Sequence, residues 1–517
     1  MATPNEKLAA SLAQLQVIQK GGRRVFQSRE LTRVHRERLI QQGFLQEVIK
    51  GWLMSTNPDT HPGDTTPWYA SFWEFCAHYC QQRFGDRWHL SPEQSLLLHG
   101  ENTAVPRLVT IHAPKGTNNT VELLFGTSLY DLKQTESPSD PDITVRDGLR
   151  LLTPAAALSR VSENFYVRYP VEAQLALGNI RDASEVLPRL LDGGHSTVAG
   201  RLAGAFRRVD RAGIGDEILG AMKAAGYDVR ETDPFNPKQI FNGAISAVAP
   251  IAGRMKAMWE MFRSPVIGLF PRAPGLPSDT NAYLRAVDDI YTSDAYHSLS
   301  IEGYHVSPDL IERVRSGHWD PDYHDDDRQG RDALAARGYW QAFQLVKESI
   351  ARIIVGEDTS VLIRKAHSEW YRELFQPCVV AGLIPASALA GYRNDAVFLR
   401  NSRHVPPRSE AVRDAMPALF DLLENEAEAS VRAVLGHWLF GYIHPYPDGN
   451  GRVARLLMNA MLASGGYPWT IIRHEDRDAY MAVLEAASVN MNIEPFVRFV
   501  ADQVQWSMEQ APIARRL

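Results

Sequence analysis

The alternation of hydrophobic and polar residues predicts a few strands in the first part of the chain and helices almost everywhere else. Between Ser28 and Gly43 apolar residues recur at helical spacing, and residues 44–54 follow as two short strands joined by a turn. Strand-like runs return at residues 108–112 and 121–125, after an aromatic helical stretch. The first part of the chain therefore mixes both kinds of element.

Helical periods dominate the rest of the sequence. They fill residues 155–225, stop at the turn-rich segment Asp233–Pro237, and resume with one irregular interlude at residues 392–407. A length of 517 residues allows about three domains of roughly 150 residues each. We therefore expect a mainly α protein with three parts: a small helix and hairpin unit in residues 1–60, an α+β and then helical region in residues 61–233, and a helical domain in residues 238–517.

Composition narrows the classes of protein. Lys and Arg together number 55 against 61 Asp and Glu, a formal net charge of -6, so the chain as a whole is not built to coat nucleic acid or an anionic membrane. Three cysteines cannot form a disulfide framework at this size, which favours a reducing compartment. No run approaches the roughly 18 apolar residues of a membrane helix, and the first residues lack a signal-peptide pattern. We expect a cytoplasmic protein with no membrane partner.

One segment departs from this acidic balance. Residues 20–50 contain only three acidic side chains against eight basic ones, which are Lys20, Arg23, Arg24, Arg29, Arg33, Arg36, Arg38 and Lys50. Helices, a small hairpin and a basic face are typical of a winged helix-turn-helix, so we expect that fold in residues 1–60, with DNA as a partner. As a whole, residues 20–230 resemble the winged-helix antitoxin and regulator family of abortive-infection systems, through the patterns GFLQEVIKGWLM and GLRLLTPAAALSRV. A winged helix used only for protein contacts is the alternative.

The clearest chemical signal is the segment His444–Arg455, HPYPDGNGRVAR, which we call the motif segment. Two glycines around Asn450 allow a tight turn whose amides point one way, and a strongly helical stretch begins directly after it. Amides at the positive end of a helix form an anion site. Arg452 and Arg455 stand three residues apart and can reach the same polyphosphate.

The other polar residues of the motif segment suit phosphoryl chemistry. Asp448 can hold Mg²⁺ against phosphates, and His444 can accept a proton near neutral pH because its ordinary pKa is about 6.5. The chain has no GxxxxGK[ST] sequence, so the site is not a P-loop. A turn rich in Gly and Asn between two helices is often only structural, but that interpretation leaves a histidine, an aspartate and two arginines unexplained.

The motif segment matches the Fic family pattern HPFx[DE]GNGRxxR at every defined position except Tyr446, where the family usually has Phe. The chain resembles this family over roughly residues 279–505, which include ALAARGYWQAF, YRNDAVFLRNSRHVPP and NMNIEPFVRFV. The resemblance implies a Fic-type helical core with a short β-hairpin flap. It also implies that AMP is transferred from ATP to a Ser, Thr or Tyr hydroxyl of a protein, with pyrophosphate as the leaving group.

The same resemblance assigns roles to individual residues. His444 is the base, Asp448 binds magnesium, and the phosphates of ATP are bound by Gly449, Asn450, Gly451, Arg452 and Arg455. Asn490 is expected to help hold the adenosine. The flap, which pairs with an extended target segment as an added strand, corresponds to Val397, Phe398, Leu399, Arg400, Asn401, Ser402 and Arg403.

A second family pattern, [ST]xxxE[GN], lies upstream as Ser298-Leu-Ser-Ile-Glu302-Gly303, at the end of an expected short helix. The resemblance implies that Glu302 forms a salt bridge with Arg455 and so denies the γ-phosphate its productive place. This ion pair must break, or the helix must move, before the triphosphate binds in line. The chain is therefore expected to inhibit itself.

Two other functions stay open at this point. One is a DNA-binding regulator or antitoxin-like protein whose Fic core serves as a nucleotide sensor. The other keeps the enzyme fold but removes AMP, or transfers a different phosphate-containing group.

Overall fold

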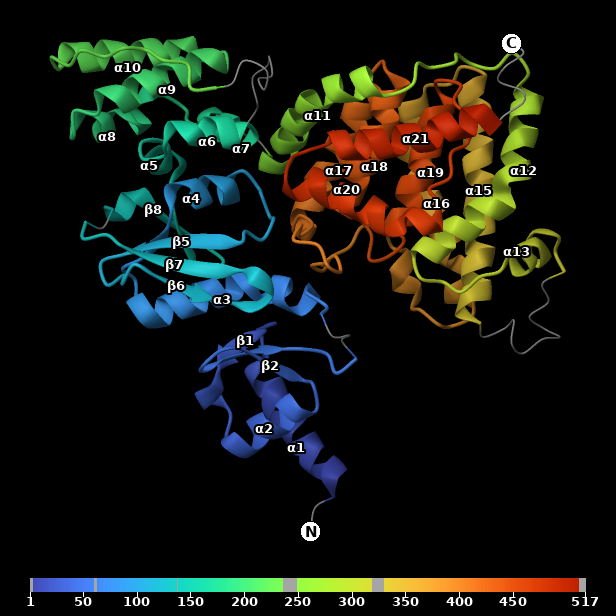
Figure 1. Cartoon of the computed structure of the whole chain (residues 1–517), viewed down its shortest axis with the longest axis horizontal. Coiled ribbons are helices and arrows are strands. Elements are labelled where there is room, and N and C mark those ends of the chain that lie inside the picture. The colour runs from blue at the N-terminus through green and yellow to red at the C-terminus, as the bar shows by residue number, and fades with distance from the viewer. Residues whose placement is uncertain (1–2, 60–62, 137, 236–248, 319–329, 511–517) are drawn as a thin grey trace. The chain divides into compact units, whose positions relative to one another are not determined.

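The computed structural model describes residues 3–59, 63–136, 138–235, 249–318 and 330–510 (Figure 1). By its internal contacts the chain forms two compact units. The first unit contains Met1–Pro250 together with Phe398–Val405, and the second contains Ile251–Val397 and Pro406–Leu517. The protein is mainly helical, and its sheets are small.

The first unit begins with a helix, a strand, a second helix and a hairpin. These are α1 (Pro4–Ile18), β1 (Val25–Gln27), α2 (Arg33–Gln41), β2 (Leu45–Ile49) and β3 (Trp52–Ser55). The three strands pair antiparallel in the order β1-β3-β2, so the predicted hairpin in residues 44–54 is confirmed. Their inner faces and the helices bury a core of Leu15, Phe26, Leu31, Leu39, Leu45 and Leu53.

The helix predicted to start at Ser28 starts later. Ser28–Glu30 form a separate single turn of 3₁₀ helix, and Thr32 precedes the first residue of α2. The break falls at Leu31, which is extended with φ -115° and ψ 142° and places its side chain in the core. Burial of Leu31 therefore overrides the local preference for one continuous helix.

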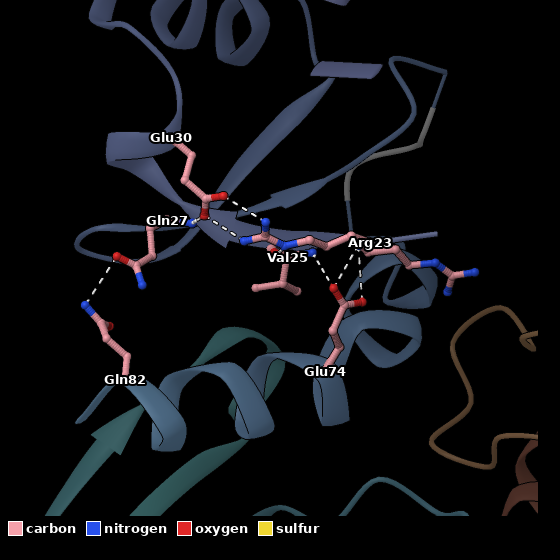
Figure 2. Close-up of polar contacts among 7 residues, drawn as sticks. Arg23, Val25, Gln27, Glu30, Glu74 and Gln82 are labelled. Atoms are coloured by element: carbon pink, nitrogen blue, oxygen red, sulfur yellow. Dashed lines mark hydrogen bonds and ion pairs between the residues drawn. The ribbon is translucent and has the colours of Figure 1, made fainter. Parts of the chain in front are cut away.

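Next along the chain is α3 (Thr66–Phe84), which anchors β1 through a carboxylate. Glu74 on α3 accepts hydrogen bonds from the backbone amides of Arg24 and Val25, at 2.9 and 3.0 Å (Figure 2). The same view shows Arg23 bonded in two places to Glu30, and Gln82 of α3 bonded to Gln27. The edge of the small sheet is therefore tied to the next helix.

The rest of the first unit is an α+β region followed by short helices. A four-stranded sheet in the order β4-β5-β7-β6 contains β4 (His89–Leu90), β5 (Leu108–Ala113), β6 (Asn119–Glu122) and β7 (Ser128–Lys133). In sequence, the helix α4 (Pro92–His99) connects β4 to β5. The strand β8 (Ile143–Arg146) pairs with β9 (Leu149–Leu152). The helices that follow are α5 (Pro154–Leu158), α6 (Glu163–Arg168), α7 (Pro170–Asn179), α8 (Leu187–Leu191), α9 (Ser196–Arg208) and α10 (Ala212–Ala224).

The described residues of the second unit contain helices and no strand. Its helices are α11 (Pro250–Leu269), α12 (Thr280–Ile301), α13 (Pro308–Arg315), α15 (Arg331–Ile354), α16 (Thr359–Val380), α17 (Ser409–Glu424), α18 (Ala429–Ile443), α19 (Asn450–Ala463), α20 (Arg477–Val489) and α21 (Glu494–Gln510). Every residue of α19 except Gly451 is buried, so this helix lies at the centre of the bundle. None of the helices in the described ranges combines the length and the apolar character needed to cross a membrane.

The expected flap differs from the β-hairpin implied by the resemblance. Within Val397–Arg403 no residue is in a strand, and the chain reverses at a turn at Arg400–Asn401, where Asn401 has φ 58°. Asparagine tolerates this left-handed conformation better than most residues. The reversal of a hairpin is therefore present without paired strands, because the two arms do not hydrogen-bond to each other as a ladder.

Candidate active site

His444 stands at the end of α18, in a conformation that ends the helix. Its φ of 51° and ψ of 60° are left-handed, and its amide still donates to the carbonyl of Phe440 at 3.0 Å. The ring nitrogen Nδ1 lies 3.4 Å from the carbonyl oxygen of Gly441. Because a carbonyl only accepts, we assign the ring proton to Nδ1, which leaves Nε2 as the basic nitrogen.

The surroundings of His444 keep its ring neutral. Burial, followed by the charge of Arg393, lowers the pKa of His444 to about 4, although the Gly441 carbonyl, Glu302 and Asp448 act in the opposite direction. A neutral imidazole at physiological pH has a lone pair available for a proton. The environment therefore suits His444 to act as a base.

Arg393 is a supporting residue that the sequence analysis did not single out. Its side chain is 2% exposed, and its guanidinium donates to the carbonyls of His444 at 2.8 Å, Asp395 at 2.9 Å, and Pro407. Its own amide donates to the carbonyl of Pro445 at 2.9 Å. Burial lowers the pKa of Arg393 to about 10, which leaves it charged at pH 7. Nothing in the hydrophobic pattern marks this arginine, because its role is to fix backbone that is distant in sequence.

The turn after His444 is closed by Asn450. The Asn450 side chain accepts from the amide of Tyr446 and donates to its carbonyl, both at 2.8 Å. Gly449 precedes α19 with φ 76°, and a Cβ there would lie 2.7 Å from the ring of Phe375. The Asn450 side chain thus shapes the turn, and its backbone amide at the start of α19 can face a phosphate. Tyr446 itself stacks on Tyr371, with ring centroids 3.8 Å apart.

Arg452 is buried with part of its hydrogen-bonding capacity unused. The residue is 1% exposed, and its guanidinium lies over the rings of Phe375 and Tyr304, at 4.9 and 5.2 Å from their centroids. Its Nη2 is 3.7 Å from Asp448, and its Nε has no hydrogen-bond partner within the part of the chain described. A buried cation with an unsatisfied N–H is costly unless an anion completes it.

Arg455 is held by the expected inhibitory helix. From α19 it reaches the end of α12, where its Nε donates to the Ser298 hydroxyl at 3.0 Å and its Nη2 to the Ser298 carbonyl at 3.0 Å. The same Nη2 contacts the Glu302 carboxylate at 2.7 Å. Burial opposes ionisation of this arginine, but the Glu302 charge prevails and raises the pKa of Arg455 above its ordinary value. Burial likewise favours the neutral form of Glu302, but Arg455 and then Arg452 lower its pKa, so both partners stay charged.

The Glu302 carboxylate lies at the start of α19. A Cβ built on Gly451 would come within 2.3 Å of Glu302 Oε1, so the carboxylate packs directly on that glycine. Amides at a helix N-terminus and nearby guanidinium groups form an anion site. In this structure the Glu302 carboxylate lies at the position where the motif segment is expected to bind an anion.

The helix that carries Glu302 is anchored away from the motif segment. Asp294, eight residues before Glu302 on α12, accepts from the Tyr339 hydroxyl at 2.7 Å and from Trp469 Nε1 at 2.9 Å. Burial raises the pKa of Asp294 to about 6. Beyond it, Arg477 donates to the carbonyl of Ile301 at 2.9 Å. The position of Glu302 is therefore fixed by contacts from three other elements.

Asp448 and Asn490 differ from the buried residues of the site. The Asp448 side chain is 60% exposed, and one of its oxygens accepts from the amide of Gly449 at 2.6 Å. The described residues contain no group of three or more His, Cys, Asp or Glu arranged to hold a metal ion. Asn490 is exposed and ends α20. Its adenosine role stays a prediction.

Residues 359–462 match the family model described as the Fic/DOC family. Among curated proteins, the chain is 31% identical over 232 residues to a protein adenylyltransferase Fic of Nematostella vectensis, covering 44% of this chain and 50% of that protein. It is 37% identical over 122 residues to the protein of the same name from Drosophila willistoni, covering 23% of this chain and 24% of that protein. The chain thus spans half or less of the length of these relatives.

Part of the chain also aligns with solved structures. Fic-1 of C. elegans, residues 134–508, has a TM-score of 0.38 and 18% identity, covering 66% of this chain and 96% of that one. A Fic domain containing signaling protein from Bacteroides thetaiotaomicron has a TM-score of 0.34 and 19% identity, covering 49% of this chain and 95% of that one.

Proposed function

Because residues 359–462 form a Fic/DOC domain, we propose that this protein is a self-inhibited protein adenylyltransferase, which moves AMP from ATP to a Ser, Thr or Tyr hydroxyl of a target protein. The observation that carries the proposal is the Glu302 carboxylate on the first turn of α19, paired with Arg455 at 2.7 Å. A site already holding an internal anion is suited to an anionic ligand. The curated relatives are named protein adenylyltransferases, which supports this reaction over the alternatives.

In the proposed reaction His444 Nε2 takes the proton of the target hydroxyl. The hydroxyl oxygen then forms a bond to the α-phosphorus, the bond from that phosphorus to the bridging oxygen breaks, and pyrophosphate leaves with both electrons of that bond. Arg452 and Arg455 bind the phosphate tail, and the amides of the turn face its oxygens. A positioned general base contributes about 10²- to 10⁴-fold in rate.

Magnesium fits the residues present if the nucleotide supplies most of its ligands. Asp448 is a single exposed carboxylate beside the turn, and Mg²⁺ is often held by one or two carboxylates with phosphate oxygens and water. When bound, the ion would neutralise charge on the phosphates. Asp448 is the residue that would hold it.

The ion pair between Glu302 and Arg455 provides the test. We expect Glu302→Gly to increase incorporation of AMP from labelled ATP at least tenfold, because the phosphate then competes with no internal carboxylate. Glu302→Gln removes the charge and keeps the size, and it should show the same direction of change. In either background His444→Ala should abolish incorporation.

A matched control exists on the surface. Glu357 pairs with Arg352 at the same 2.7 Å, and both side chains are exposed. Glu357→Gly should leave incorporation at the wild-type level. Activation by both substitutions, or transfer that survives His444→Ala, would refute the proposal. Mass spectrometry with each of the four nucleoside triphosphates identifies the transferred group, and release of AMP from a modified protein instead would favour the removal reaction.

We also propose that residues 4–55 are a winged helix that contacts DNA. The order of elements and the sheet order β1-β3-β2 support this fold. Lys20, Arg29 and Lys50 are exposed and could meet phosphates. Fluorescence anisotropy with a labelled duplex, at several salt concentrations, tests the contact, and a labelled single strand tests whether a duplex is required.

A further inference from the structure

The segment Phe398–Val405, which contains most of the expected flap, packs with the first unit of the chain. The contacts of these residues group them with residues 1–250, although they follow α16 in sequence. Val405 packs against the apolar core around Phe72, Val105 and Leu129. The flap segment therefore already has a partner within its own chain.

Two backbone oxygens of this segment are occupied by a short stretch of the α+β region. The amide of Val105 donates to the carbonyl of Arg403 at 2.8 Å, and the hydroxyl of Thr103 donates to the carbonyl of Val405. Carbonyls two residues apart in an extended chain point to the same edge. The guanidinium of Arg403 in turn donates to the carbonyl of Val105 at 3.4 Å. Thr103–Val105 thus lies along one edge of the segment, joined to it by one backbone and one side-chain hydrogen bond.

Side chains hold the other arm. The guanidinium of Arg24 lies over the ring of Phe398, 5.0 Å from its centroid. Arg400, at the turn, is 3.5 Å from Asp64. Contacts from the first unit therefore reach both arms of the flap and the turn between them.

The stretch that meets the flap is itself rigidly placed. Asn102 donates to Glu172 of α7 at 2.8 Å and accepts from the amide of Ala104 at 3.2 Å. Val105 is fully buried, and Pro106 follows it. An occupant held in its bound shape loses little conformational entropy on pairing.

We infer that Thr103–Val105 is a built-in occupant of the target-docking edge of the flap, so that an extended target segment must displace it before it can pair there. This inference rests on the proposed function, because it takes Val397–Arg403 as the docking element. It places a second restraint on the enzyme, which acts on access of the protein target and is separate from the restraint that Glu302 exerts on the nucleotide.

Hydrogen exchange tests the contact without any need for activity. Thr103→Val removes the hydroxyl donor at nearly constant size, and we expect amides in residues 398–407 and the amide of Val105 to exchange at least fivefold faster, with α19 unchanged. Val105→Pro removes the second donor and should produce a larger increase. Thr120→Val changes an exposed threonine of β6 and should alter neither segment.

Target modification is then measured in the Glu302→Gly background, where nucleotide access is open. The probes are extended peptides of twelve residues, each with one Ser, Thr or Tyr. We expect Thr103→Val to raise kcat/KM for these peptides about fivefold and to leave the KM for ATP unchanged. Thr120→Val should change neither constant.

The outcomes separate the two proposals. Unchanged exchange in residues 398–407 in both variants would overturn the inference even if AMP transfer is robust. Faster exchange with no gain in peptide modification would also overturn it, because the edge would then not be the docking edge. Complete absence of AMP transfer in Glu302→Gly would refute the proposed function, and with it the docking role of the flap.

Discussion

The arginines of residues 20–50 and the two arginines of the motif segment have different surroundings in the structure. In residues 20–50, Arg23 pairs with Glu30 (Figure 2), and Arg33, which is 81% exposed, pairs with Glu37. Arg36 and Arg38 donate to backbone carbonyls, of Ser28 and Lys7. In the motif segment, Arg452 and Arg455 are buried, and each has one nitrogen without a hydrogen-bond partner in the described structure. Local charge alone is thus a poor guide to a binding site, and the buried arginine donors of the motif segment support the proposed phosphate site.

The largest effect that tests this contrast is expected at Arg452. In the Glu302→Gly background, Arg452→Lys should reduce AMP transfer about 100-fold, because a lysine cannot reproduce the flat fork between two rings and each charge-assisted hydrogen bond contributes about 1.5–3 kcal/mol. Arg33→Lys, on the exposed surface, should leave the rate unchanged. Single-turnover kinetics with labelled ATP measure both. An equal loss of AMP transfer in the two variants would show that buried and exposed arginines do not differ in this respect.

A second test fills the place where the Glu302 carboxylate lies. Gly451→Ala puts a Cβ within 2.3 Å of the position of that carboxylate, and it should weaken ATP binding about tenfold in the Glu302→Gly background, as measured by calorimetry. Gly220→Ala is the matched control, because a Cβ there meets nothing within 4 Å and the residue is exposed on α10. The control should bind normally and be stabilised by about 0.5–1 kcal/mol. Undiminished ATP binding in Gly451→Ala would show that the phosphates bind elsewhere.

A pH profile tests the difference between His444, whose pKa is lowered, and a histidine in water. Because the pKa of His444 is lowered to about 4, the ring stays unprotonated as the pH falls from 8 to 5.5, and kcat/KM in the Glu302→Gly background should change less than about twofold. The Glu302 charge raises the pKa of His444, so the Glu302→Gly substitution lowers this pKa further and keeps the ring unprotonated. Loss of activity begins as the pH approaches the pKa from above. A midpoint near 6.5 would show instead that His444 titrates as in water.

The smallest effect concerns the basic N-terminal segment. If only Lys20, Arg29 and Lys50 meet phosphates, log K for DNA should fall with log salt at a slope of about -3, since each contact contributes about -0.9. Arg33→Ala combined with Arg36→Ala should leave that slope unchanged, because both side chains are engaged within the protein. A slope near -7, or a slope that becomes less steep by the contribution of two contacts in the double variant, would show instead that all the basic side chains of residues 20–50 contact DNA.

The sequence predicted some features well because they depend on neighbours in the chain. The hairpin in residues 44–54 and a helix that follows the turn of the motif segment were expected from local pattern and turn chemistry, although the helix begins at Asn450, within the expected turn. The expected ion pair between Glu302 and Arg455 is present, because the family pattern encodes both ends. The helix break at Leu31 was missed because only burial of that side chain in the tertiary core explains it.

The features that escaped prediction depend on residues far apart in sequence. Arg393 fixes the backbone of His444 from 51 positions away, and its segment has no regular period. Tyr304 and Phe375 enclose Arg452 from two different elements, and as single aromatic residues they read as ordinary core positions. The expected hairpin at Val397–Arg403 has a turn but no ladder, since its backbone partner lies near Val105.

The buried carboxylate of Asp294 has a consequence for how the proposed restraint can be adjusted. It joins α12 to Tyr339 and Trp469, and none of these three side chains belongs to the motif segment. Substitutions at these positions can loosen or tighten the hold on Glu302 while every group proposed to bind the nucleotide stays unchanged. Under the proposed function, the ease with which the restraint by Glu302 is released and the rate of AMP transfer can therefore be altered by separate mutations.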